Sequence, residues 1–387
     1  MKLPIDLKAV IEAATDIESA RSTPVSVSVL IDDSAPGDVA AHVRSAFVGA
    51  GAHARVTVGY FAGPAFSPYE GDDMAVIVAG FSEEVGRRAA EIRAAGVPVM
   101  VVTSMPSLVA DMASAYGNPI PEGDLVAPEG VEGCEADGDA ACASGEVAGA
   151  HVSVFTGIRA AKSAGAGAAA GSAGAQASSP DVLDAPIPID AAAACALDRR
   201  MGEWVVAACR EKRLALALSF PFVRKPLSLE AVSATSLQNA GIGLVLFIPG
   251  ADMPLMTLNQ AKMLLQIAAA YGEPMSAARV KELAAIVAGG FACRSVARQV
   301  AGAVPAIGWA VKAGVGYAGT KAMGLAAIEY FERGGNIAGL AGVVSSATAK
   351  ATQIAGDVAA TPAGARVLST VKTAVRQGAA SVLKKTE

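Results

Sequence analysis

Runs of apolar residues with short polar breaks predict alternating strands and helices in the first third of the chain. Val25–Ile31 begins with β-branched residues at alternate positions and ends as a continuous apolar run, which is typical of a buried strand. Similar runs follow at Arg55–Tyr60, Met74–Ala79 and Val97–Thr103. Helical spacing lies around and between these runs, at Ile5–Arg21, Val39–Val48, the residues after Ser82, and Ser107–Ala115. The alternation predicts an α/β domain with a mostly parallel sheet over residues 1–116.

A later helix is expected to complete this domain. Asp190 can cap a helix over residues 190–210, and its apolar residues recur on one face, among them Leu197, Met201 and Trp204. We expect this helix to pack back on the sheet.

Residues 117–182 have the composition of a linker. Gly117–Gly149 carries eight carboxylates and no lysine or arginine, and Ser163–Ser179 is almost entirely alanine, glycine and serine. Such a segment buries too little apolar surface to offset the entropy of ordering the chain. We therefore predict disorder, interrupted by a short ordered piece around His151–Phe155.

Beyond residue 183 the apolar positions recur at helical intervals, which predicts an all-α region. We expect connecting helices over residues 183–235, apolar helical hairpins over 236–335 and amphipathic helices over 336–387. No charge occurs from Ala231 to Ala251, but the strongly apolar arm Ala240–Pro249 is too short to cross a bilayer alone. A hairpin with Asp252 at its turn and a second arm within Val304–Ala327 fits this pattern. Three glycines of the second arm would allow close packing on the first: Gly308, Gly316 and Gly319.

Composition narrows the class of protein. Apolar residues make up 53% of the chain and charged residues 17%, with a mean hydropathy of +0.44. Soluble domains carry about 25% charged residues, so this chain favours packed helices in water or in lipid. The net charge of -5 argues against a nucleic-acid partner. We see no secretory signal and no cysteine pair with zinc-ligand spacing, which favours a reduced, cytoplasmic-side protein.

One loop stands where a nucleotide-binding domain would hold phosphate. The strand–helix order is similar to that of a small GTPase, whose phosphate loop follows the first strand and ends in glycine and lysine. Ser34, Gly37 and Asp38 occupy that place here, so a carboxylate stands at the lysine position and would repel phosphate. After the fourth strand, Thr103-Ser104 stands where a guanine-reading Asn-Lys-x-Asp motif is expected. Ser34, Gly37 and Asp38 are therefore at most candidates for a vestigial phosphate loop that once bound a nucleotide cofactor.

The remaining motifs point to no chemistry. Gly314–Gly319 matches the dinucleotide pattern G-x-G-x-x-G, but no strand precedes it, and glycines that pack helices explain it better. The three aspartates Asp32, Asp33 and Asp38 are typical of turns and helix caps, and the three histidines are scattered. We therefore predict no catalytic residue, no metal and no cofactor.

The helical half resembles a known family. The segment Ala240–Pro254, the helix that ends at Tyr271-Gly272, the sequence Pro305–Trp309, and Gly319–Phe331 are similar to the YcjF-type domain, the domain of unknown function number 697. The resemblance covers about a quarter of the chain. It implies a position behind an Era-like GTPase domain and association with a membrane, and it supplies no catalytic residue to carry over.

These patterns lead to three hypotheses for the function. The first is a membrane-associated bacterial-type protein on the cytoplasmic side, with a degenerate, non-hydrolysing GTPase-like (Rossmann-like) domain and a scaffold or interaction role. The second is a divergent nucleotide-binding switch. The third is a soluble homo-oligomeric interaction module. The expected partners are a membrane, a second copy or an unidentified protein, and an enzymatic role is the less favoured expectation.

Overall fold

The computed structural model describes residues 7–62, 71–128, 188–245, 252–275 and 308–336, together with positions 339, 340, 342 and 346. Several predictions made from the sequence fall outside these residues. They are the ordered piece at His151–Phe155, the residues of the first apolar arm from Leu246 to Pro249, and nearly all of the C-terminal helices.

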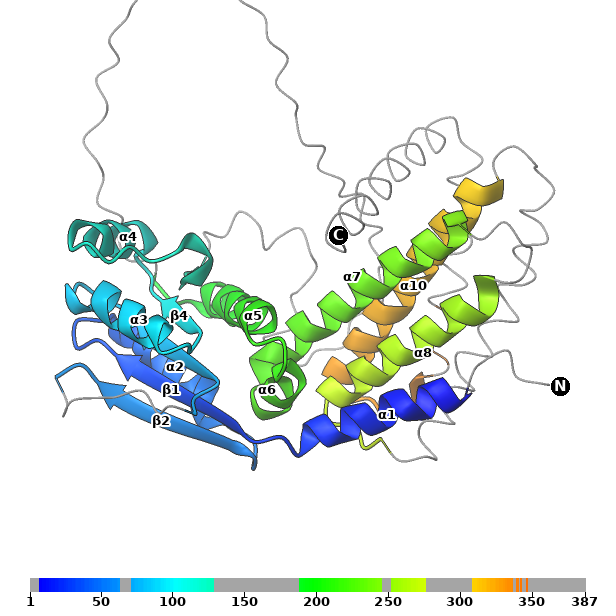
Figure 1. Ribbon diagram of the computed structural model, residues 1–387, viewed down its shortest axis with the longest axis horizontal. Helices are drawn as coiled ribbons and strands as arrows, with labels where there is room; N and C mark the ends of the chain where they lie inside the picture. The colour runs from blue at the N-terminus through cyan, green and yellow to red at the C-terminus, as the bar shows by residue number, and fades with distance from the viewer. Residues whose placement is uncertain are drawn as a thin grey trace, which may run out of the picture.

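A five-stranded parallel sheet forms the first part of the protein (Figure 1). Its strands are β1 (Val25–Ile31), β2 (Ala54–Tyr60), β3 (Met74–Val78), β4 (Val99–Val102) and β5 (Leu125–Val126). They lie in the order β2-β1-β3-β4-β5, and every adjacent pair is parallel. The predicted α/β domain with a parallel sheet is therefore confirmed.

Helices cover both faces of the sheet. On one face, α3 (Glu84–Ala94) and α4 (Pro106–Ala115) pack on a cluster that includes Leu30, Ile77 and Val101. On the other face, α2 (Gly37–Val48) and α5 (Ala191–Ala208) pack on the alternate residues of the same strands. The side chain of Asp190 accepts a hydrogen bond from Ala193 N at 2.8 Å and caps α5, as the sequence predicts.

The fifth strand lies in a segment that the sequence assigned to the linker. A short 3₁₀ turn, Glu122–Asp124, leads into β5, which pairs with β4. Asp124 accepts a hydrogen bond from Arg93 at 3.1 Å and another from Trp204 Nε1 at 3.4 Å. The prediction of disorder was wrong from 117 to 128, because a strand of two residues is too short to show a period and its acidic neighbours have partners elsewhere in the fold.

Helix α1 (Leu7–Arg21) does not lie on the sheet. Its buried residues Val10, Ala14 and Ile17 join the core of the helical half, where α1 contacts α8 (Asp252–Ala270) and α6 (Arg213–Ser219). Figure 1 shows α1 running alongside α8, away from the strands. The amphipathic pattern predicted the helix correctly but cannot specify which core its apolar face joins.

Two 25-residue helices, α7 (Pro221–Val245) and α10 (Gly308–Glu332), pack along each other beside α8. The segment Arg224-Lys225-Pro226 lies inside α7, and the break between α6 and α7 falls at Phe220. Pro226 leaves the carbonyl of Phe222 without its usual helical donor. That carbonyl faces Gly202 of α5, where an added Cβ would lie only 2.4 Å from the oxygen.

Helix α10 packs closely on α7 through glycine, although not at all the predicted positions. A Cβ at Gly316 would lie 3.1 Å from the carbonyl oxygen of Asn239, and a Cβ at Gly324 would lie 2.3 Å from Val232 Cγ2. Nothing lies within 4 Å of a Cβ built at Gly319. The prediction therefore holds for Gly316, is wrong for Gly319 and missed Gly324.

No helix within the described ranges combines the length and the apolar character needed to cross a bilayer.

Candidate functional site

The carboxyl ends of β1 and β3 are the first place to look for a site. In the order β2-β1-β3-β4-β5, the chain connections leave β1 and β3 in opposite directions, and open α/β sheets bind ligands in the crevice at such a switch point. The two loops that form this crevice are Asp32–Pro36, after β1, and Ala79–Ser82, after β3.

The carboxylate of Asp32 fills this crevice. It is 3% exposed and accepts hydrogen bonds from the backbone N–H groups of Ser34 (3.1 Å), Gly80 (2.9 Å) and Ser82 (3.2 Å). The hydroxyl of Ser34 also donates to it at 2.9 Å and accepts from Phe81 N at 2.7 Å. An internal anion thus uses the amide donors that would otherwise face a bound phosphate.

The two loops are also in direct backbone contact. A Cβ at Gly80 would lie 2.3 Å from the carbonyl carbon of Ser34 and 2.5 Å from Ala35 N. Glycine is required at this position for a steric reason, because any side chain would push the loops apart. The crevice is closed by the protein itself.

The predicted phosphate-loop residues do not converge on a common point. Ser34 faces the β3 loop, and Gly37 is the first residue of α2, with open space where a Cβ would stand. Asp38 accepts from Val39 N at 2.9 Å and from Ile189 N at 3.1 Å, so it fastens the start of α5 to the start of α2. The role of Asp38 is therefore structural, because its hydrogen bonds connect the starts of two helices.

Thr103 and Ser104 are buried at the end of β4. Thr103 Oγ1 accepts a hydrogen bond from Met105 N at 3.1 Å, while its own N–H donates to Val126 O at 3.0 Å. Both side chains are at most 1% exposed. They form the turn into α4 and present no group to a ligand at the surface.

A polar cluster that the sequence did not predict lies at the amino ends of β1 and β3, the ends far from Asp32. The buried side chain of Asp72 accepts from the hydroxyls of Ser26 and Ser28 and from Arg55 Nη2 at 2.8 Å. Asp73 pairs with Lys212 at 2.7 Å. These bonds join three strands and α6, which is a structural role, and the adjacent aspartates before β3 were the only sequence signal.

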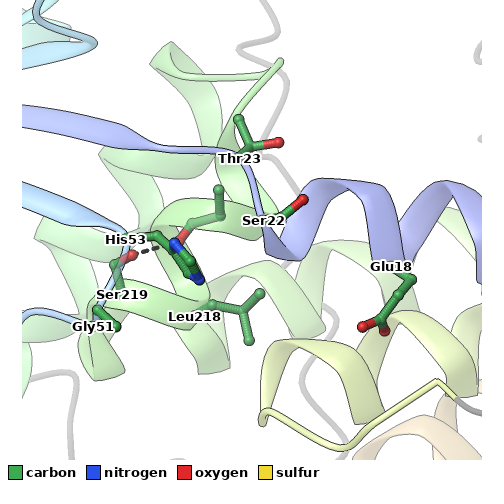
Figure 2. A pocket seen from close by; sticks show the side chains of 9 residues that line it. Glu18, Ser22, Thr23, Gly51, His53, Leu218 and Ser219 are labelled. Atoms are coloured by element: carbon green, nitrogen blue, oxygen red, sulfur yellow. Dashed lines mark hydrogen bonds between the residues drawn. The ribbon is translucent and has the colours of Figure 1, made fainter.

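A cavity of about 300 Å³ opens between α1, the turn before β2, and α6 (Figure 2). Glu18 and Ser22 come from the end of α1, His53 from the turn, and Leu218 and Ser219 from α6. Gly51 N donates to Ser219 O at 3.1 Å, and this hydrogen bond holds the turn before β2 against the end of α6. Its lining mixes single polar groups with apolar side chains and assembles no reactive set.

The core of the helical half contains amides and hydroxyls where α7, α8 and α10 meet. Asn239 Nδ2 donates to Thr320 Oγ1 at 2.9 Å, and Gln260 Nε2 donates to the same oxygen at 2.8 Å. Asn259 donates to Asn239 Oδ1 at 3.1 Å, and Thr320 donates to Gly316 O at 2.7 Å. Asn239, Gln260 and Thr320 are at most 1% exposed. We call this group the polar core.

Large apolar side chains are exposed on the outside of the same three helices. Leu237 is 52% exposed, Leu255 47%, Leu325 41% and Tyr317 37%. Buried polar groups and exposed apolar side chains thus occur on the same three helices, beside their apolar core. We call the last residues of α7 together with the first residues of α8 and α10 the bundle end. Between Ala231 and Ala261 the sequence contains one charged residue, Asp252.

The thiols and metal-binding residue types form no site among the residues that the structure describes. No group of three histidine, cysteine, aspartate or glutamate side chains is positioned to hold a metal there. Cys209 is buried, and burial raises the pKa of its thiol to about 12, so it stays protonated.

Comparison with known proteins gives no further guide, because no family model, curated protein or solved structure matches this chain.

Proposed function

We propose that this chain is a non-enzymatic, membrane-associated scaffold or interaction protein on the cytoplasmic side. In this proposal the sheet domain is a degenerate, GTPase-like (Rossmann-like) domain, and the helical half is a YcjF-type domain that contacts the bilayer. The resemblance of the segments around Ala240–Pro254 and Gly319–Phe331 supports the second part.

The polar core and the exposed apolar side chains of the same helices carry the proposal. Where helices pack in lipid, the outer surface is apolar and polar side chains hydrogen-bond between helices. Leu237, Leu255 and Leu325 are exposed and the polar core is buried, which is compatible with this arrangement.

The length of the charge-free region sets the depth of insertion. In α7, residues 231–245 carry no charge, which corresponds to about 22 Å of helix at 1.5 Å per residue. The hydrocarbon core is about 30 Å thick, so the bundle end would enter one leaflet and return. Backbone groups at the turns would need partners from protein or water, because lipid offers none.

Flotation with lipid vesicles, using the full chain and single-charge variants, tests the proposal. Leu237→Glu and Leu325→Glu should lower the floating fraction several-fold with little change in stability, because both side chains are already exposed. Val48→Glu is the matched control, since Val48 is a 68% exposed apolar residue of the sheet domain, and it should float as the wild type does. A wild-type protein that stays soluble, monodisperse and self-associated through Leu237 would instead favour the third hypothesis, the oligomeric module.

A divergent nucleotide-binding switch is the second hypothesis. Against it stands Asp32, which already occupies the amides of Gly80 and Ser82 at the switch point. Titration calorimetry with magnesium and GTP or ATP should detect no binding. Micromolar binding that is lost in a Gly37 or Asp38 variant would revive the switch.

A further inference from the structure

The outer edge of β2 is an unpaired strand edge. β2 is the terminal strand of the sheet and is seven residues long. It pairs with β1 in unbroken register, with Ala54 beside Val25 at one end and Tyr60 beside Ile31 at the other. Figure 1 places β2 at the margin of the sheet, with no labelled element beyond it. No strand in the described part of the chain pairs with this edge.

The free main-chain groups belong to alternate residues. His53 O accepts from Val25 N, and Phe61 N donates to Ile31 O, so the odd-numbered residues of β2 point toward β1. In a strand the orientation alternates, and the N–H and C=O groups of Val56, Val58 and Tyr60 therefore point outward. These are the donors and acceptors that a further strand would use.

The edge lacks the features that natural proteins use to prevent edge pairing. It has no proline, no bulge and no lysine. Its one charge, Arg55, already pairs with the buried Asp72 at 2.8 Å. Val58 and Tyr60 are 37% and 44% exposed, so apolar side chains accompany the free backbone groups.

We propose that the β2 edge binds the β2 edge of a second copy of this chain, in antiparallel orientation. A two-fold axis beside Thr57 pairs all seven residues, with Val56 opposite Val58 of the partner and Ala54 opposite Tyr60. Arg55 then lies opposite the partner's Gly59, so no like charges oppose each other. The strand can thus form all its outward hydrogen bonds with a copy of itself without opposing like charges, which selects a second copy as the occupant. The sheets of the two copies join into one continuous sheet.

Dimerisation would raise the apparent affinity of the protein for a membrane that each copy binds weakly. β2 and the bundle end of α7, α8 and α10 lie at opposite ends of the molecule in Figure 1. Pairing through β2 therefore leaves both bundle ends uncovered, and two weak anchors on one particle raise the apparent affinity by avidity. The dimer itself does not depend on the proposed membrane binding.

Sedimentation velocity on the full chain, over a low to high micromolar range, tests the dimer. The wild type should shift from monomer to dimer mass as concentration rises. Val58→Pro removes one outward N–H donor without removing a bond to β1, and it should halve the mass at high concentration while leaving the circular dichroism spectrum unchanged. Ile11→Lys is the matched control, because Ile11 is an apolar residue of similar exposure (42%) on α1, and it should remain a dimer.

A second variant covers the case in which proline disrupts the strand. Val58→Lys keeps every backbone donor and places a charge opposite the partner's Val56, with the same charge of the partner diagonal to it, and it should also give a monomer. A wild type that stays monomeric at all concentrations, or a folded Val58→Lys protein that stays dimeric, overturns the proposal. A monomer produced by Ile11→Lys would place the interface on α1 and overturn the proposal as well.

Discussion

At the scale of single residues, Asp32 holds together the two loops at the carboxyl ends of β1 and β3. Replacing it with alanine removes the acceptor of the N–H groups of Ser34, Gly80 and Ser82, and the N–H of Gly80 is buried. We expect Asp32→Ala to lower the free energy of unfolding by roughly 2–4 kcal/mol, since an unsatisfied buried donor costs about 1–3 kcal/mol and a partly buried hydrogen bond contributes about 0.5–1.5 kcal/mol. Asp33→Ala, at an exposed residue that accepts one bond from Ala62 N, should cost about 1 kcal/mol. Urea unfolding compares the two, and equal losses would contradict the role given to Asp32.

His42 makes the contact between α2 and α5 sensitive to pH. Its Nε2 lies 2.7 Å from Asp198 Oδ1, and the hydrogen bond to that carboxylate raises the pKa of His42 above 6.5 despite partial burial. Because the folded pKa is the higher one, the stabilisation is complete below about pH 6.5 and is lost as pH rises through the folded value.

The predicted size of this effect is about 0.5 kcal/mol, because both side chains are partly solvated. Unfolding midpoints between pH 5.5 and 8.5, a range that brackets the ordinary histidine pKa of about 6.5, should show a fall in stability that His42→Gln removes. His53→Gln, at an exposed turn residue, is the control and should retain the fall. A pH profile unchanged by His42→Gln would show that the pair contributes nothing.

The sequence located the loop after the first strand, but it did not predict which groups the residues of that loop contact. Asp32, Ser34 and Asp38 were recognised as a loop after the first strand, but their contacts depend on the β3 loop and on the start of α5, which lie far away along the chain. The polar core was not predicted either, because Asn239, Gln260 and Thr320 come from three separate helices and no short spacing connects them.

At the scale of elements, glycine spacing alone did not specify which glycines pack helix against helix. Gly319→Ala should stabilise α10 by about 0.5–1 kcal/mol, because the position is open and alanine is the better helix former. Gly324→Ala should destabilise the protein by about 1–3 kcal/mol, since its methyl group would overlap Val232. Thermal unfolding of the two variants, which carry the same chemical change five residues apart, should give shifts of opposite sign. Shifts of the same sign would mean that α7 and α10 are not packed as described.

The elements themselves were largely predictable where their period was long. The four longer strands and the helices around them follow from apolar runs and helical spacing, whereas β5 was missed because two residues show no period. Pro226 lies inside α7, although proline removes a backbone donor and usually interrupts a helix. The close approach of Gly202, which accommodates the freed carbonyl, is a tertiary feature that no local pattern shows.

At the scale of the whole molecule, α1 ties the beginning of the chain to the helical half. Val10 is fully buried against that half, whereas the adjacent Ile11 is 42% exposed. Val10→Asp should therefore destabilise the protein by several kcal/mol, and Ile11→Asp by about 0.5 kcal/mol or less. Hydrogen exchange should show that Val10→Asp releases amides in α8 before those in β1 and β3. Release that begins in the sheet would place α1 in the wrong core.

The position of α1 also constrains how the protein can be made. The ribosome completes α1 first, but its partner α8 does not begin until Asp252, some 230 residues later. At about 5–20 residues per second, the apolar face of α1 waits on the order of 10–50 s during synthesis before its partner exists. The sheet meanwhile assembles from consecutive segments up to β5, and α5, α6 and the start of α7 then cover its second face. A nascent chain that has finished its sheet domain therefore still carries α1 without its partner α8, and the apolar face of α1 is available to chaperones during translation.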